Sequence, residues 1–483
     1  MSSASASISV AGTALASTPL RPAISPIRRE LGSLALVQKT VTKKMVLEFA
    51  KKHSVQFINM QFIDLLGIPK AVTIPVHKLE DAIDTNVWFD GSSIQGFTRI
   101  FESDMYLQPD LNTVALLPWT VGSGDVTMRI ICDVYLPDGK PFSGDPRGIL
   151  KRQLAEAKKL GYDFFTGPEL EFFLFQKKDG KLSPLPHDNA GYFDQTTDLA
   201  SSIRADMSFA LDSMGVEVEA LHHEVAVGQH EIDFKYSDAL STADRAVTFR
   251  MVLKTVADRY GLHATFMPKP IFGINGSGMH VHQSMWKGGK NAFYNKKGVY
   301  GLSDLARSFI AGQLKHIRAM NAILNPLVNS YKRLVAGYEA PVYTAWGNTN
   351  RSALIRIPRI TPSRQPTGTR CELRCPDPAA NVYLTFAVML AAGMDGIKNK
   401  MTPPDPVEEN IFHMDEASAR KRKITPVAEN LDIALEELKN DSVIRNVLGD
   451  DTFEKYYELK RAEWDSYRTA VSQWEIDNYL EVY

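Results

Sequence analysis

The segment KPIFGINGSGMHVHQS, residues 269–284, places glycines on both sides of a serine and then two histidines two positions apart. If MHVHQS is a strand, alternation puts His280, His282 and Ser284 on one face and the apolar side chains of Met279 and Val281 on the other. One interpretation is a core strand whose histidines are satisfied by ordinary hydrogen bonds. The alternative is a polar face that carries chemistry, and the rest of the sequence decides between them.

The composition is that of a globular protein. The chain has 483 residues, 44% of them hydrophobic, which is enough for two or more domains. The 55 Lys and Arg residues nearly balance the 56 Asp and Glu residues. We therefore expect a small-molecule partner, with no nucleic acid and no membrane among its partners. Only three cysteines occur, which argues against a disulfide scaffold, and we interpret Cys371 and Cys375 as core residues.

The first 40 residues differ in character from the rest. They are rich in Ser, Ala and Thr, they contain Arg21, Arg28 and Arg29, and no acidic residue precedes Glu30. This composition is typical of an organellar transit peptide. We expect a plastid ahead of a mitochondrion as the destination. A disordered extension on a cytoplasmic protein is the alternative.

The remaining chain divides into two expected units of an α+β protein. Strand-like segments with Gly and Asp-Gly turns follow a short amphipathic helix near residue 42. Asp145 and Pro146 then supply the N-cap and first position of a helix that closes at Gly161. We expect an extension at 1–40, an N-terminal domain at 41–144 and a catalytic domain with a helical C-terminal tail at 145–483.

Carboxylates recur on strand-like segments whose other face is apolar. In GPELEFFLF, Glu169 and Glu171 project to the same side, and HHEVAVGQHEIDF supplies Glu224 and Glu231 around a glycine turn. Like charges that meet repel unless a cation lies between them. With Glu372 and one imidazole, these oxygens suit Mg²⁺ or Mn²⁺ better than structural zinc.

Arginines are the complementary part of the pattern. Arg370 and Arg374 flank Glu372, and the segments NSYKRLVAGYEAP and GNTNRSALIRIP add Arg333, Arg351 and Arg356. Guanidinium groups hold carboxylates and phosphates in bidentate geometry. Metals held by carboxylates beside an arginine cluster indicate phosphoryl transfer, and the lack of a GxxxxGK[ST] motif argues against a Walker-type site.

Seven motifs, in order along the chain, resemble those of type I glutamine synthetases: FDGSSIQGF, GPELEFFLF, HHEVAVGQHEID, NGSGMHVHQS, KRLVAGYEAP, NRSALIRIP and ELRCPDPAAN. The resemblance runs from about residue 41 to the C-terminus. It implies a small β-grasp-like N-terminal domain and a larger catalytic domain, built on a curved antiparallel sheet flanked by helices. It also implies a ligase that joins ammonia to the γ-carboxylate of L-glutamate through γ-glutamyl phosphate, giving L-glutamine, ADP and phosphate.

The resemblance also implies roles for individual residues. Two or more Mg²⁺ or Mn²⁺ ions are expected, one nearer the glutamate and one bridging the nucleotide phosphates. The first would be held by Glu171, Glu224 and Glu231, and the second by Glu169, His280 and Glu372. ATP would meet His282, Ser284, Arg351, Arg356 and Arg370, of which the arginines neutralise the phosphoryl group.

Glutamate and ammonium have their own implied residues. Asn275 and Gly276 would approach the amino acid, Arg333 would take its α-carboxylate, and Arg374 would meet its reacting end. Ammonium would be bound by Asp90, Ser93, Tyr192, Glu224 and Glu339. Asp90 would accept the proton, and Glu339 lies on a loop that closes over the intermediate in the family.

The resemblance implies a homo-oligomer, a dodecamer of two stacked hexameric rings, in which Asp90 comes from the neighbouring subunit. Phe412 stands where a tyrosine often sits, and HHEVAVGQHE is one residue shorter than in the adenylylated branch. The branch without adenylylation is therefore expected. Ala336 departs from the proline that is usual in the family loop.

Two alternatives remain at this point. A glutamate–amine ligase would use the same phosphorylation but a polyamine or another amine as acceptor, and Asp90, Ser93 and Glu339 favour ammonia over it. A non-catalytic structural or regulatory relative would be expected to have lost metal ligands, whereas all six predicted ligands are present.

Overall fold

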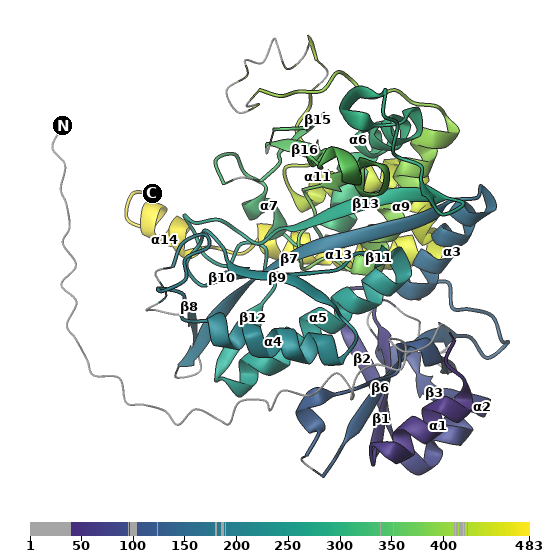
Figure 1. Ribbon diagram of the computed structural model, residues 1–483. Coiled ribbons are helices and arrows are strands. Elements are labelled where there is room, and N and C mark those ends of the chain that lie inside the picture. The colour runs from purple at the N-terminus through teal and green to yellow at the C-terminus, as the bar shows by residue number, and fades with distance from the viewer. Residues whose placement is uncertain are drawn as a thin grey trace.

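The computed structural model describes residues 40–483, apart from 95, 97–103, 123, 179–180, 185–187, 189, 339, 351, 410, 412–413, 415–418, 420 and 423 (Figure 1). Almost all of the predicted extension therefore lies outside the described residues. Within them, none of the helices is both long and apolar enough to cross a bilayer.

The helices are α1 (Lys43–Lys52), α2 (Leu79–Thr85), α3 (Pro146–Lys159), α4 (Ser201–Ser213), α5 (Ala239–Arg259), α6 (Asp304–Leu324), α7 (Ser330–Arg333), α8 (Gln365–Gly368), α9 (Val382–Lys398), α11 (Leu431–Asn440), α12 (Ser442–Leu448), α13 (Asp450–Arg468) and α14 (Gln473–Tyr479). The predicted helix at Asp145 is confirmed. The Asp145 side chain accepts a hydrogen bond from the Arg147 amide at 3.1 Å, and Pro146 opens α3.

A small sheet forms the N-terminal unit, with the strand order β2-β1-β6-β4-β3 and β5 paired to β6. Its strands are β1 (Phe57–Ile63), β2 (Pro69–Pro75), β3 (Val87–Asp90), β4 (Asp104–Pro109), β5 (Ala115–Leu116) and β6 (Thr127–Tyr135). The β1–β6 pair is parallel and the other pairs are antiparallel. Apolar residues of α1 and α2 cover this sheet and close a separate small core.

A larger curved sheet runs in the order β15-β16-β17-β13-β7-β10-β9. Its path contains β7 (Asp163–Lys178), β9 (Val218–His223), β10 (Gln229–Phe234), β13 (Met279–Lys287), β15 (Tyr343–Gly347), β16 (Ala353–Arg356) and β17 (Cys371–Leu373). The strands β8 (Lys181–Pro184), β11 (Ser237–Asp238) and β12 (Leu262–Thr265) also pair with β7, and β14 (Lys290–Asn291) pairs with β13. The sheet is antiparallel as expected, except for the parallel β15–β16 pair.

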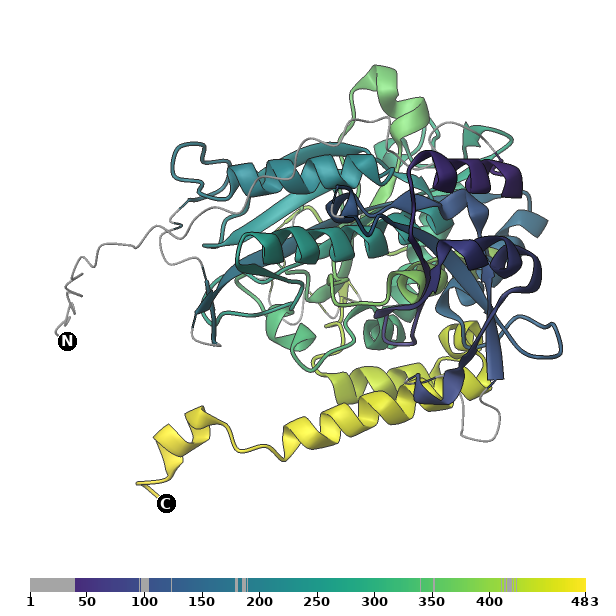
Figure 2. The same cartoon turned by 90° about the horizontal axis from the view of Figure 1, so that it is seen from below.

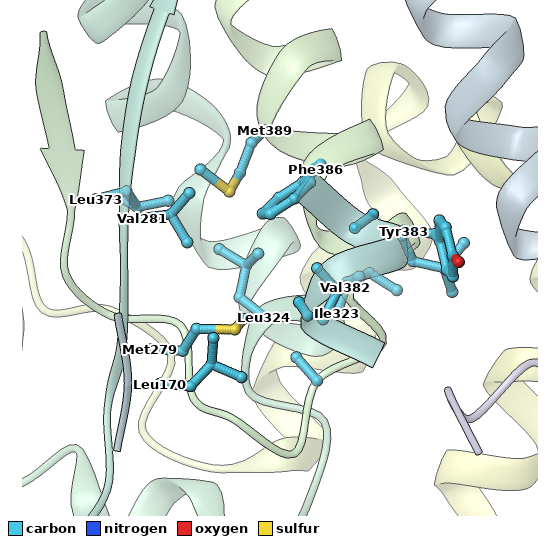
Figure 3. Packing of buried hydrophobic residues seen from close by; sticks show 14 of the residues in the cluster. Leu170, Met279, Val281, Ile323, Leu324, Leu373, Val382, Tyr383, Phe386 and Met389 are labelled. Carbon is cyan, nitrogen blue, oxygen red and sulfur yellow. The ribbon is translucent and has the colours of Figure 1, made fainter. Parts of the chain in front are cut away.

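One face of this sheet packs on helices α6 and α9. Leu170 and Met279 are register partners on β7 and β13, and Val281 pairs with Leu373 of β17 in the same way. These four side chains are fully buried and point toward Phe386 of α9 and the end of α6 (Figure 3). Because side chains alternate along a strand, the opposite face carries the residues between them, which include the predicted carboxylates and histidines.

Arg147 joins the two units. It is 2% exposed, and its guanidinium contacts Asp110 at 2.8 Å, Asp133 at 2.7 Å and Asp244 at 2.9 Å. Asp110 and Asp133 belong to the small unit, while Asp244 lies on α5 of the large one. The interface between the units is thus fixed by a buried cation with three carboxylate partners.

The C-terminal helices run along the outside of the large unit, and α14 projects beyond the end of α13 (Figure 2). The tail exposes large apolar side chains, among them Trp474 at 61% and Leu480 at 75%. The two cysteines interpreted as core residues, Cys371 and Cys375, are free thiols and completely buried.

Candidate active site

Two central strands bring the first predicted group together. His280 of β13 is the register partner of Glu169 on β7, and the next strand, β17, carries Glu372. Ligand atoms of these three side chains lie within 4.8 Å of one another. His280 Nδ1 lies 3.4 Å from Glu169 Oε2 and 3.7 Å from Glu372 Oε1. Burial, reinforced by the charge of Arg374, lowers the pKa of His280 to about 4, so the imidazole is neutral and able to ligate a metal.

Two arginines hold Glu372 in place. Arg374 Nη1 donates to Glu372 Oε1 at 2.6 Å, and Arg356 Nε lies 2.6 Å from Glu372 Oε2. Burial alone would raise the pKa of Glu372, but the neighbouring imidazoles and the guanidinium groups of Arg374 and Arg356 lower it. Glu372 is therefore an ionised carboxylate with no solvent exposure.

His282 forms a second link to Glu169. Arg370 Nε donates to His282 Nδ1 at 3.2 Å, which leaves the proton on Nε2, 2.7 Å from Glu169 Oε1. Burial opposes ionisation of Glu169, yet the neighbouring His282 and His280 hold its pKa well below its usual range. Glu169 is thus an anion fixed between the two histidines whose spacing is visible in the sequence.

The second predicted metal group lies on the same face of the sheet, between β7 and its other neighbours, β10 and β9. Glu171 is the register partner of Glu231 on β10, and Glu224 directly follows β9. Ligand atoms of Glu224 and Glu231 lie within 4.8 Å of one another and of His222, a residue that the sequence did not single out. The three ligands that lie within 4.8 Å of one another here are thus His222, Glu224 and Glu231, whereas the sequence predicted Glu171 with Glu224 and Glu231.

Glu171 is held by donors from the neighbouring strands. Its Oε2 accepts hydrogen bonds from Gln229 Nε2 at 2.7 Å and from the Gly278 amide at 2.9 Å. Burial and the charge of Glu224 raise the pKa of Glu171 to about 8. Burial, with the charges of Asp233, Glu171 and Glu169, also raises the pKa of Glu231 well above its usual range.

Asp233 connects the two groups. Its carboxylate lies within 4.8 Å of ligand atoms of Glu169 and Glu231, and Oδ1 is buried without a hydrogen-bond partner among the described residues. It stands two residues after Glu231 on β10, so the same alternation that selected Glu169 and Glu171 would have found it. The sequence alone did not indicate that this face of β10 meets Glu169.

The donor set fits divalent cations. Carboxylates crowd one face of the sheet, and the raised pKa values of Glu171, Glu231 and Asp233 show that their joint ionisation is unfavourable without added positive charge. A dication between them would offset that repulsion, and oxygen-rich sets with one imidazole match Mg²⁺ or Mn²⁺.

A cleft of about 850 Å³ opens beside Glu169. The predicted residues that line it are Glu169, His282, Ser284 and Arg370. The lining residues that were not predicted include Tyr236, Arg359 and Arg364. The cleft thus combines an aromatic side chain with several guanidinium groups, which suits a planar and strongly anionic ligand.

The glycine-rich turn before β13 is held tightly by its surroundings. A Cβ at Gly276 would lie 2.2 Å from the Pro268 carbonyl oxygen, and one at Gly278 would lie 2.6 Å from Arg333 Nη2. Arg333, at the end of α7, donates from Nη1 to the Cys375 carbonyl at 2.8 Å and from Nη2 to the Arg374 carbonyl at 3.2 Å. Only glycine allows the turn to sit this close to the buried guanidinium.

The structure does not bring every predicted residue to the sheet. Asp90 ends β3 in the small unit, away from β9 and β10 (Figure 1), and its carboxylate accepts from the amide and hydroxyl of Ser92. Tyr192 does reach the site, where its ring stacks on Phe193 at 3.9 Å and meets the His222 ring edge-on at 5.5 Å. Glu339, Arg351, Phe412 and the Ser93 side chain lie outside the described part of the protein.

Two family profiles match most of the chain. The sequence profile described as "Glutamine synthetase, catalytic domain" matches residues 143–479, and the one described as "Glutamine synthetase, beta-Grasp domain" matches residues 54–137. The chain belongs to the glutamine synthetase family. The β-grasp and catalytic architecture implied by the sequence motifs is thereby confirmed.

Curated glutamine synthetases cover nearly the whole chain. The Clostridium saccharobutylicum protein is 53% identical over 444 residues, covering 92% of this chain and 99% of its own length. The Thermus thermophilus protein is 53% identical over 448 residues with the same coverage.

Two solved structures show the same fold. A Plasmodium falciparum glutamine synthetase, determined by cryo-electron microscopy, has a TM-score of 0.81 at 27% identity and covers 92% of this chain and all of its own. A structure described as a GmaS/ADP complex has a TM-score of 0.82 at 33% identity, covering 90% of this chain and 99% of its own.

Proposed function

We propose that this glutamine synthetase family enzyme uses the face of the large sheet described above to ligate ammonia to L-glutamate at the expense of ATP. The observation that carries the assignment is the juxtaposition of two carboxylate groups with an arginine-lined cleft. The glutamate γ-carboxylate attacks the γ-phosphorus of ATP and releases ADP. Ammonia then attacks the acyl carbon of γ-glutamyl phosphate and releases phosphate, which leaves L-glutamine.

Divalent cations are part of this proposal. Mg²⁺ or Mn²⁺ would be held by Glu169, His280 and Glu372 on one side of β7, and by Glu171, Glu224 and Glu231 on the other. His222 and Asp233 extend the donor set, because both lie within 4.8 Å of these ligands. Bound cations would neutralise phosphate charge, the chemistry that phosphoryl transfer requires.

The arginines would position the two substrates. Arg370 lines the cleft, and Arg356 lies on Glu372 close to it, so both would face the phosphoryl group. Arg333 would take the α-carboxylate of glutamate beside Asn275 and Gly276, and Arg374 would meet the γ-carboxylate. Arg351, His282 and Ser284 complete the proposed nucleotide contacts.

Ammonium would bind between subunits. Asp90, the proposed proton acceptor, lies in the small unit and is exposed beside Trp88, which is 55% exposed. On the large unit, Tyr192 and Phe193 are exposed beside His222, and Phe272, three residues before Asn275, is 98% exposed. A second copy that places its Asp90 here would cover these apolar side chains. Ser93, Tyr192, Glu224 and Glu339 would complete the ammonium site, and the proposed assembly is a dodecamer of two hexameric rings.

The acceptor is tested by following ADP, phosphate and glutamine with the full-length protein, glutamate, ATP and Mg²⁺. Ammonium should saturate the reaction and yield glutamine in equal amount to phosphate. A panel of alkylamines and polyamines provides the comparison. Turnover with an amine but not with ammonium would reassign the roles of Asp90 and Glu339 and favour the glutamate–amine ligase.

Import into an organelle is a separate proposal. It rests on the composition of residues 1–40, with plastid ahead of mitochondrion and a cytoplasmic enzyme as the alternative. A fluorescent protein fused after residue 40 should be imported into isolated organelles and shortened by processing. Absence of both import and processing would favour the cytoplasm.

A further inference from the structure

Lys269 is a buried cation in the substrate turn that has no role in the reaction as described. Its side chain is 9% exposed, and Nζ donates to the Ile274 carbonyl. Its backbone is clamped by Asn329, which accepts from the Lys269 amide at 2.8 Å and donates to the Lys269 carbonyl at 3.0 Å. Lys269 Cδ lies 3.2 Å from the position that a Cβ on Gly276 would occupy. The lysine is therefore built into the turn that carries Asn275 and Gly276.

The Lys269 ammonium also meets a different segment. Nζ lies 3.9 Å from the centre of the Tyr338 ring, which is cation–π geometry. Tyr338 ends the segment Leu334–Tyr338, in which residues 335–337 are exposed and Gly337 has φ +96°. Within the described part of the chain, residues 336–338 make no backbone–backbone hydrogen bond. The contact with Lys269 thus links the end of this segment to the substrate turn.

We propose that Lys269 is a positioning residue that tethers the Leu334–Tyr338 segment to the substrate turn through the Tyr338 ring. The proposal rests on the proposed function for its catalytic consequence. Tyr338 directly precedes Glu339, which is assigned to the ammonium site. The tether would keep this part of the site in place while the acyl phosphate waits for ammonia.

The tether would favour one of two reactions of γ-glutamyl phosphate, aminolysis over hydrolysis. In aminolysis, the nitrogen of ammonia bonds to the acyl carbon, the carbon–oxygen bond to phosphate breaks, and glutamine and phosphate form. In hydrolysis, a water oxygen makes that bond instead, and glutamate and phosphate form. Loss of the tether should therefore raise the ratio of phosphate to glutamine rather than simply slow the enzyme.

The tether itself is measured by hydrogen–deuterium exchange of peptides that cover residues 331–346. In Lys269→Met, which keeps the aliphatic stem, and in Tyr338→Leu, exchange should become about fivefold faster, the size expected for one cation–π contact with a partly exposed ring. Tyr338→Phe keeps the ring and should exchange as the wild type does. Lys254→Met is a matched control, because Lys254 makes a longer cation–π contact, 6.0 Å, with Phe266 elsewhere.

The consequence is measured as phosphate released per glutamine formed. This ratio should stay near one in the wild type, Tyr338→Phe and Lys254→Met, and the part of it above one, which measures hydrolysis, should rise about fivefold in Lys269→Met and Tyr338→Leu. The Lys269→Met/Tyr338→Leu double variant should be no worse than either single variant, because both remove the same contact. Lys269→Arg, which keeps a cation, should restore coupling in part.

The two readouts separate the two proposals. Unchanged exchange in both Lys269→Met and Tyr338→Leu would overturn the tether, whatever reaction the enzyme performs. Faster exchange with an unchanged product ratio would overturn its role in retaining the intermediate. Failure of the wild type to make glutamine would instead overturn the proposed function, while the exchange result would still stand. If Lys269→Met does not fold, Tyr338→Leu tests the contact from the exposed side.

Discussion

At the scale of single residues, the site is defined by neighbouring carboxylates whose negative charges repel one another. Glu171 faces Glu231 across two antiparallel strands, and burial together with neighbouring charge raises the pKa of both. The ionised state of such a pair is unfavourable without a cation and becomes favourable when a divalent cation lies between the two carboxylates. The same arrangement therefore explains both why these residues are costly for the fold and why they are useful for phosphoryl transfer.

Replacing Glu171 tests this assignment. Glu171→Ala removes one carboxylate from the proposed metal group nearer the glutamate, and turnover should fall by at least about 100-fold. Mn²⁺ titration followed by electron paramagnetic resonance should show weaker binding. Glu217→Ala is the control, because Glu217 pairs with Lys235 on the surface. Undiminished activity of Glu171→Ala would show that the assignment is wrong.

The glycine at 276 permits a second test at this scale. Gly276→Ala would force its Cβ to 2.2 Å from the Pro268 carbonyl, so the turn must move, at a cost of about 1–3 kcal/mol. We expect a lower melting temperature and a higher KM for glutamate. Ser277→Ala is the neighbouring control, since the Ser277 hydroxyl is buried without a hydrogen-bond partner in the described part of the chain. Equal behaviour of the two variants would contradict the steric argument.

At the scale of elements, the catalytic face exists because its reverse face is a core. Leu170, Met279, Val281 and Leu373 pack on α6 and α9, which fixes the orientation of every residue between them. The rigidity of the site therefore depends on the packing of the core beneath it. Helix residues far from the substrates thereby fix the orientation of the catalytic side chains.

His316 of α6 provides a pH test of that helix packing. Its Nδ1 lies 2.5 Å from Asp441 Oδ2 and its Nε2 lies 2.9 Å from Asp395 Oδ2, which ties α6 to α9 and to the start of α12. Burial would lower the pKa of His316, but the hydrogen bonds with Asp441 and Asp395 raise it. A raised pKa means that the stabilisation is complete below pH ~6.5 and is lost as pH rises through the folded-state value.

Thermal unfolding between pH 6 and pH 9 measures this contribution. His316→Leu should destabilise the protein by about 1–3 kcal/mol at pH 6 and by less at pH 9, because the imidazolium is lost from the wild type at high pH. His77→Leu, at an exposed position, is the matched control. A stability difference that does not shrink with pH would contradict the imidazolium assignment.

Much of the fold was predictable from local patterns. The alternation in MHVHQS selected the face that His280 and His282 share, and Asp145 with Pro146 marked the start of α3. Asp233, His222 and Gln229 were missed because their importance depends on β10 lying beside β7 with Glu231 opposite Glu171. That register follows from contacts between segments about 60 residues apart, which one sequence does not reveal. Lys269 was missed for a related reason, since its partner Tyr338 lies on a distant turn.

At the scale of the whole molecule, the two units are joined through buried charge. Arg147→Met would leave Asp110, Asp133 and Asp244 without their shared cation, and breaking such a buried network costs about 3–5 kcal/mol. We expect the denaturation midpoint in urea to fall and the small unit to unfold first. Lys151→Met, which removes a half-exposed partner of Asp133, should cost less than about 1 kcal/mol. Similar losses in both variants would contradict the role given to Arg147.

The same arginine limits how this gene can be recombined. A fragment that stops before α3 contains Asp110 and Asp133 without their cation. A fragment that starts at α3 contains Arg147 with only Asp244 of its three carboxylate partners. A chimera with a distant relative's first 140 residues should therefore yield functional enzyme only when the donor supplies acids equivalent to both Asp110 and Asp133. Compatibility of the two halves can thus be read from two positions before any chimera is made.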